Sequence, residues 1–195
     1  MRTLTVLISL LVIVVAGAGI YVYSGSYPVG ADVPHTGAIF SVLATVRDRG
    51  IAAGARGIQP PADLNDPRRV SEGAGQYATM CGNCHLAPGY EDGPTWEGLY
   101  PHPPRLAHAT DLKPAEVFWA IKHGVKFSGM PAWGKSHSDD EIWSITAFVL
   151  ELPHLSPRQY ADIVSRAPPD TDMLMMPMPQ RSADGAAMPG NMGTP

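Results

Sequence analysis

The chain has 195 residues, of which 45% are hydrophobic and 16% are charged, and it contains 20 glycines and 20 prolines. Its formal net charge of -4, from 14 basic and 18 acidic side chains, argues against a nucleic-acid-binding surface, because such surfaces need a basic excess. Only two cysteines are present, Cys81 and Cys84, which excludes a scaffold of several disulfides and a metal site built from four thiolates of this chain.

An apolar segment lies at the N-terminus. Residues 4–23 form a nearly continuous apolar run of roughly twenty residues, enough to cross the ~30 Å hydrocarbon layer of a membrane as a helix. Arg2 is the only charged side chain before this run, so the positive-inside rule predicts a cytoplasmic N-terminus and export of the chain after Tyr23. We therefore expect residues 1–25 to be a transmembrane anchor. The alternative is a signal peptide cleaved after Ala16-Gly17-Ala18, which exports the same domain.

Residues 26–62 are expected to form an amphipathic helix followed by a linker. The helix is predicted to end near Gly50, and residues 52–62 have the Gly, Ala and paired Pro of a linker. Its polar face carries few basic residues, so we interpret it as a spacer packed on the main domain rather than a membrane-surface helix. The apolar residues that repeat with helical spacing are Ile39, Val42, Leu43 and Val46.

Residues 63–160 are predicted to be a compact all-α domain with three recognisable helices. The first follows the N-cap residue Asp66 and runs from Pro67 to about Met80. The second starts at Pro114 and ends at Gly124. The third follows Ser138, which forms a capping box with Glu141. The apolar residues expected on the third helix are Ile142, Trp143, Ile145, Phe148 and Val149.

Residues 161–195 differ in composition from the domain. They contain no aromatic residue, six prolines and six methionines. Such a segment cannot bury enough apolar surface to offset the entropy of ordering it, so we expect it to be disordered. Thioethers suit Cu(I), which makes copper handling an alternative role, although the segment has no His or Cys to strengthen a site.

The chemistry is concentrated in Cys81-Gly82-Asn83-Cys84-His85, which has the C-x-x-C-H spacing of c-type haem attachment. Two thiols at this spacing at the end of a helix can each bond one vinyl group of the porphyrin, and the imidazole of His85 then reaches the iron. The alternatives are a dithiol redox pair, half of a zinc site and a structural disulfide. A redox pair needs a βαβ setting and zinc needs further ligands, so the motif favours haem.

The residues around this motif resemble class I c-type cytochromes. A helix bearing Gly73 and Tyr77 precedes the motif, Gly129-Met130-Pro131 follows it, and a last helix carries Trp143 and Phe148. Three further stretches resemble bacterial membrane-anchored monohaem cytochromes c, namely residues 21–27, Pro34-His35 and residues 98–134.

The resemblance implies a cytochrome c fold, with three or more helices around one covalent haem and an N-terminal transmembrane helix. It implies one haem c bound to Cys81 and Cys84, with His85 and Met130 as axial ligands of the iron. It also implies that a proline carbonyl accepts a hydrogen bond from the other ring nitrogen of His85, which makes Pro103 and Pro104 the candidates.

Met130 is the only methionine between His85 and the C-terminal segment. Gly129 allows close approach to a haem, and Pro131 favours an extended loop. The alternatives for the sixth ligand are His123, His137 or an open coordination position. The remaining histidines are interpreted as surface or core-edge residues: His35, His102, His108 and His154.

With both axial positions of the iron filled, no catalytic residue is predicted, and the expected function is single-electron transfer. The resemblance implies tethering to the outer face of a bacterial inner membrane, with the haem domain in the periplasm. The expected partners are a membrane dehydrogenase or quinol-oxidising complex as donor and a terminal oxidase as acceptor. The alternative is that the chain is the electron-port subunit of a membrane dehydrogenase or reductase complex.

Overall fold

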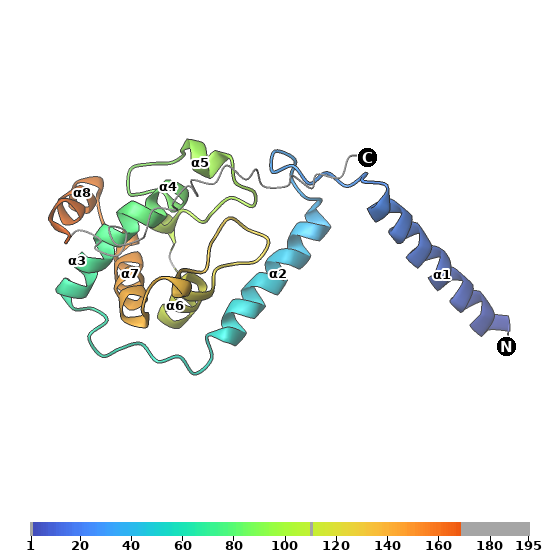
Figure 1. The fold of residues 1–195 in the computed structure, drawn as a ribbon, viewed down its shortest axis with the longest axis horizontal. Coiled ribbons are helices and arrows are strands. Elements are labelled where there is room, and N and C mark those ends of the chain that lie inside the picture. The colour runs from blue at the N-terminus through green and yellow to red at the C-terminus, as the bar shows by residue number, and fades with distance from the viewer. Residues whose placement is uncertain (1, 110, 169–195) are drawn as a thin grey trace, which may run out of the picture.

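Helices form all the regular structure of residues 2–109 and 111–168, which are the residues that the computed structural model describes (Figure 1). The predicted all-α class is confirmed. The α-helices are α1 (Arg2–Tyr23), α2 (Gly37–Gly54), α3 (Pro67–Gln76), α4 (Gly82–His85), α5 (Pro94–Glu97), α6 (Pro114–His123), α7 (Asp139–Glu151) and α8 (Pro157–Arg166). The other helical turns are a π-helical turn (Tyr77–Cys81) and three short 3-10 turns (Leu106–His108, Trp133–Lys135 and Leu152–His154).

Helix α1 stands apart from the other helices in Figure 1, and none of its residues is buried. It is long and apolar enough to cross a membrane. A helix that is apolar on all sides and exposed in the fold is typical of a membrane span or of a signal sequence.

Helix α2 is longer than the sequence predicts. It continues past Gly50 to Gly54, so the first residues of the predicted linker are helical. Gly50 does not adopt a positive φ, whereas Gly57 does, at 82°. The alanines that follow Gly50 favour continuation of the helix, so a glycine alone does not end it.

Helices α3 and α7 cross at the centre of the domain, and α6 and α8 pack beside them. The contact between α3 and α7 depends on Gly73, because a Cβ atom at this position would lie 1.9 Å from the carbonyl oxygen of Ser144. Tyr77 and Phe148 fill the adjoining core, with ring centroids 5.4 Å apart. The largest fully buried side chains there are those of Tyr77, Phe148, Ile142, Ile145 and Leu152.

We expect Gly73→Ala to destabilise the domain by at least about 3 kcal/mol, because the new methyl group forces two backbones apart in a close-packed core. Gly50→Ala is the matched control. A Cβ there meets nothing within 4 Å, so replacing glycine within a helix should stabilise slightly. Thermal unfolding of both variants tests the difference. An equal melting temperature for the two would contradict the close crossing of α3 and α7.

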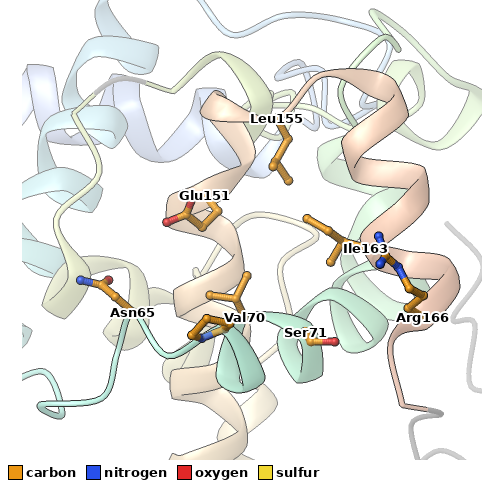
Figure 2. Close-up of a pocket in the computed structure, with 8 residues that line it drawn as sticks. Asn65, Val70, Ser71, Glu151, Leu155, Ile163 and Arg166 are labelled. Atoms are coloured by element: carbon orange, nitrogen blue, oxygen red, sulfur yellow. The ribbon is translucent and has the colours of Figure 1, made fainter.

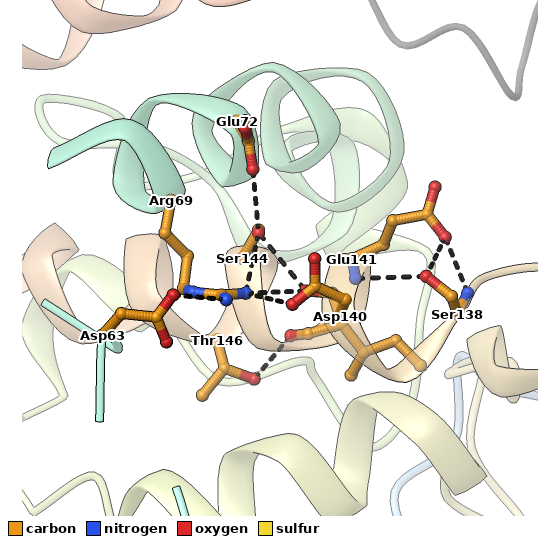
Figure 3. A network of polar contacts seen from close by, with 9 residues as sticks. Asp63, Arg69, Glu72, Ser138, Asp140, Glu141, Ser144 and Thr146 are labelled. Atoms are coloured by element: carbon orange, nitrogen blue, oxygen red, sulfur yellow. Dashed lines mark hydrogen bonds and ion pairs between the residues drawn. The ribbon is translucent and has the colours of Figure 1, made fainter. Parts of the chain in front are cut away.

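Polar contacts brace the same crossing (Figure 3). The guanidinium of Arg69 on α3 lies 2.8 Å from a carboxylate oxygen of Asp63 and 2.8 Å from one of Asp140 on α7. The Ser144 hydroxyl donates to Glu72 at 3.3 Å. Hydrogen bonding to Arg69 lowers the pKa of Asp63, so the stability from this pair is present above the ordinary pKa of Asp63 and is lost as pH falls.

The two predicted helices with strong local signals are confirmed. Helix α6 ends where Gly124 takes a positive φ of 65°. Helix α7 starts at the predicted capping box, in which the Ser138 hydroxyl accepts from the Glu141 N–H at 3.3 Å. Local signals suffice at these ends because both the cap and the stop are made within a few residues.

Helix α8 spans the predicted domain boundary at Tyr160. Ser156 and Gln159 form a second capping box, and Pro157 occupies the first helical position. The helix packs on the core through Tyr160, Ile163 and Val164. Lack of aromatic residues after Tyr160 does not prevent this packing, since aliphatic side chains supply the apolar stripe. The rest of the segment expected to be disordered, residues 169–195, lies outside the described residues.

Candidate functional site

The two cysteines and His85 lie on one helical run that begins with α3. The π-helical turn ends at Cys81, and Cys84 and His85 follow in α4. Such turns are uncommon within helices and occur frequently at functional sites. The sequence prediction of a helix up to about Met80 identifies the run but not the wide turn within it.

The chain changes direction immediately after His85. Leu86 has a positive φ of 63°, which is costly for a bulky side chain. The Tyr77 hydroxyl donates to the Leu86 carbonyl at 2.6 Å and holds this turn. Burial raises the pKa of Tyr77, so the hydroxyl keeps its proton and remains a donor. The spacing between these two residues gives no sequence signal for this bond.

Both cysteines are free thiols and are partly buried. Burial, with a smaller contribution from Cys84, raises the pKa of Cys81 to about 12. A dithiol oxidoreductase needs a cysteine with a lowered pKa, so this thiol does not suit that chemistry. Residues 2–109 and 111–168 also contain no cluster of three or more His, Cys, Asp or Glu side chains able to hold a metal ion, which disfavours a zinc site there.

His85 is oriented by a backbone carbonyl. Its Nδ1 atom lies 2.9 Å from the carbonyl oxygen of Pro104. A carbonyl only accepts, so Nδ1 carries the proton and Nε2 of the neutral ring keeps its lone pair for a metal. Burial lowers the pKa of His85, against the smaller opposing effect of the Pro104 carbonyl, and therefore favours the neutral ring. These groups fit a covalent haem. Two thiols lie near an imidazole whose Nδ1 is hydrogen-bonded to Pro104 and whose Nε2 is available to bind iron.

The adjacent proline has another partner. The Pro103 carbonyl accepts from the Trp96 indole N–H at 2.8 Å. Trp96 also lies between His102, stacked with a centroid separation of 4.1 Å, and the guanidinium of Arg105, 4.4 Å from the ring centroid. These contacts order the loop that carries Pro104. The sequence around Trp96 gives no signal for this role, because its contacts form only when the loop folds.

Met130 lies in a loop closed by short-range bonds. The Val125 N–H donates to the Met130 carbonyl at 3.2 Å, and the Ser128 hydroxyl accepts from the Met130 N–H at 3.2 Å. A Cβ atom at Gly124 would lie 2.7 Å from the carbonyl carbon of Pro131, so the two ends of the loop approach each other closely. The Met130 side chain is partly buried against the hydrophobic core, as is that of Cys81.

The Met130 loop contacts the loop that leads to Pro104. A Cβ atom at Gly129 would lie 2.9 Å from a methyl carbon of Leu99. Leu99 precedes Tyr100 and the prolines that follow it. The structure therefore brings together two loops, one with Met130 and one with the carbonyl that orients His85.

Four of the other histidines contact residues other than Cys81 and Cys84. His102 bonds to the Trp96 carbonyl at 3.0 Å and His108 lies 3.2 Å from Glu91. The ring of His123 packs against Trp119, with centroids 4.8 Å apart. His137 is buried, with Nδ1 2.9 Å from the Ser136 hydroxyl and Nε2 without a partner.

An open groove lies between α3, the end of α7 and α8 (Figure 2). Val70, Leu155 and Ile163 supply its apolar side chains, and Glu151 and Arg166 line its rim. None of the cysteines, His85 or Met130 lines this groove, so it is separate from the candidate site.

Comparison with known proteins gives one family match. The family model described as "Cytochrome C oxidase, cbb3-type, subunit III" matches residues 68–149. No curated protein sequence matches. Among solved structures, a chain of the Kuenenia stuttgartiensis reducing HAO-like protein complex is 24% identical, with a TM-score of 0.40. That match covers 49% of this chain and 46% of the other.

The family match coincides with the core elements of the site. Residues 68–149 include α3, the Cys81 to His85 motif, the Met130 loop and nearly all of α7. Together with the all-helical fold, this match identifies the region as a c-type cytochrome domain.

Proposed function

We propose that the chain is a single-electron carrier with one haem c, bound through Cys81 and Cys84 and ligated by His85 and Met130. A cytochrome c domain implies haem-based electron transfer. The observation that best supports the ligand assignment is the 2.9 Å contact between His85 Nδ1 and the Pro104 carbonyl, which leaves Nε2 available. It also favours Pro104 over Pro103 as the residue that orients His85.

Haem c bound at this site would supply reversible one-electron chemistry, at a potential that a methionine ligand raises relative to two nitrogen ligands. The chain's own residues hold the two ligands in place. Pro104 fixes the His85 ring, and Ser128 fixes the backbone of Met130. The hydrophobic core against which Cys81 and Met130 pack would provide a low-dielectric surrounding, which disfavours the added charge of ferric iron.

The proposed location is the outer face of a bacterial inner membrane, with α1 as the anchor and the cytochrome domain in the periplasm. The length and apolar surface of α1 support this location. The proposed partners are a donor such as a membrane dehydrogenase or quinol-oxidising complex and an acceptor such as a terminal oxidase.

The test is a reduced-minus-oxidised visible spectrum of carbonate-washed membranes from cells producing the full chain. We expect the c-type spectrum to remain with the membranes, because carbonate removes proteins bound by charge and leaves apolar helices in place. Replacing residues 1–23 with a cleavable signal peptide should move the same spectrum to the soluble fraction. A mature wild-type protein that begins at Gly19 would contradict the anchor.

A second candidate function is an electron-port subunit of a larger oxidoreductase. The description of the matching family, a subunit of a cytochrome c oxidase, favours it. Purification with other subunits at a constant stoichiometry would support it, whereas isolation of a redox-active monomer supports a carrier. The copper-handling alternative depends on Met173, Met175, Met176, Met178, Met188 and Met192, which lie outside the described residues.

A further inference from the structure

The segment between α1 and α2 is attached to the cytochrome domain by two aromatic residues. Among residues 2–43, only Tyr27 and His35 are not exposed. The Tyr27 hydroxyl is hydrogen-bonded to His35 Nδ1 at 2.5 Å, and the His35 N–H donates to the Tyr100 hydroxyl at 3.1 Å. We call Tyr21, Tyr27, His35 and Tyr100 the aromatic clasp.

The rings of the clasp form a continuous path from the anchor to the domain. Tyr21, in the last turn of α1, meets Tyr27 edge-on at a centroid distance of 6.5 Å. Tyr27 stacks on His35 at 6.0 Å, and His35 meets Tyr100 at 5.2 Å. Aromatic pairs in these arrangements stabilise beyond the area they bury. The clasp therefore joins the end of α1 to the loop that contains Tyr100.

A second contact fixes the other end of α2. A Cβ atom at Gly54 would lie 2.4 Å from the Trp119 indole of α6, so the helix end and the indole are closely packed. Helix α2 has 18 residues and spans about 27 Å. Attachments at both ends of α2 restrain rotation of the domain relative to α1. A single flexible linker would leave this rotation free.

The domain loop that the clasp contacts is the one that contains Tyr100 and precedes Pro104. Leu99, next to Tyr100, contacts the Met130 loop at Gly129. We propose that the aromatic clasp and the Gly54–Trp119 contact hold the cytochrome domain in one orientation on its anchor, with the Leu99–Gly129 face at the membrane surface, where it meets an integral membrane redox protein. This inference rests on the anchor and the haem site of the proposed function.

The surface beside this face suits a partner that is both apolar and acidic. Phe127 lies in the Met130 loop, and its side chain is 89% exposed. Its φ is positive, at 58°, so the residue has both an apolar ring in water and a strained backbone. Lys126 beside it is exposed and carries a positive charge. In protein interfaces an exposed aromatic side chain is typically buried by the partner at the centre, and cations lie at the rim.

The first experiment measures orientation in reconstituted full-length protein. Ferric haem gives an electron paramagnetic resonance spectrum that depends on the angle between the haem and the field, so a fixed domain in oriented phosphatidylcholine multilayers gives angle-dependent signals. His35→Pro removes both the imidazole and the N–H of the clasp, and it should abolish the angle dependence. Val29→Pro is the matched control, because Val29 also follows a proline but is 92% exposed.

The second experiment compares two routes of haem reduction in native membranes. For His35→Pro, reduction driven by quinol through the membrane partner should slow at least about tenfold, because a freely rotating domain meets that partner less often in a productive orientation. Reduction by a soluble dye should be unchanged. Position 35 lies outside the cytochrome domain, so the visible spectrum and melting temperature serve as controls for folding.

Each outcome bears on one hypothesis. Angle-independent wild-type signals, or an unchanged quinol-driven rate in His35→Pro, would overturn the fixed orientation even if haem and anchor are intact. Wild-type protein without covalent haem, or without membrane association, would instead contradict the proposed function.

Discussion

Replacing Met130 with alanine should remove the weak far-red charge-transfer band that a thioether ligand gives to ferric haem. The midpoint potential should fall by on the order of 0.1 V, within the ~0.8 V range that axial ligands control. Carbon monoxide should then bind the ferrous iron readily, because the sixth position is open. Optical spectra and a redox titration of the purified variant measure all three effects.

Met80→Ala is the matched control for this experiment. Met80 is another methionine of the domain and packs partly buried on the same core, but it lies before Cys81 in the π-helical turn. Its replacement should leave the band and the potential unchanged. An unaltered spectrum in Met130→Ala would place the sixth ligand elsewhere, and His123→Ala and His137→Ala would then identify an imidazole ligand.

The double replacement of Cys81 and Cys84 with alanine should abolish covalent haem attachment. The denatured wild-type chain should retain its haem through acid-acetone extraction, and the double variant should lose it completely. Asn83→Ala, at an exposed position between the two thiols, should behave like the wild type. Extraction is made on denatured protein, so it measures covalently bound haem whether or not the chain had folded. Release of all haem from the denatured wild type would rule out covalent attachment.

Features formed by residues close in sequence could be predicted, and features formed across the fold could not. The capping box at Ser138 and the stop at Gly124 are local, and the structure has both. The choice between Pro103 and Pro104 could not be made from the sequence, because the Trp96 indole decides which carbonyl is left for His85.

The same distinction explains the end of α2 but not the start of α8. The end of α2 is set beyond Gly50, where Gly54 packs on the Trp119 side chain, and this contact joins distant parts of the chain. Helix α8 has a local capping box at Ser156, so its start could have been predicted. Its aliphatic residues Ile163 and Val164 adjoin the Met-rich and Pro-rich segment, and composition alone does not distinguish them from it, although they pack on the core.

The close crossing at Gly73 has a consequence for the order of events during synthesis. Helix α3 needs Ser144 and its neighbours on α7 as a partner, and these residues follow Cys81 and Cys84 in the chain. A chain that emerges from its N-terminus first therefore exposes both thiols before the crossing can form. The burial that raises the pKa of Cys81 is absent at that stage, so its thiol has the ordinary reactivity of an unfolded cysteine. The time between emergence of the motif and arrival of α7 is thus when the thiols are most accessible to modification.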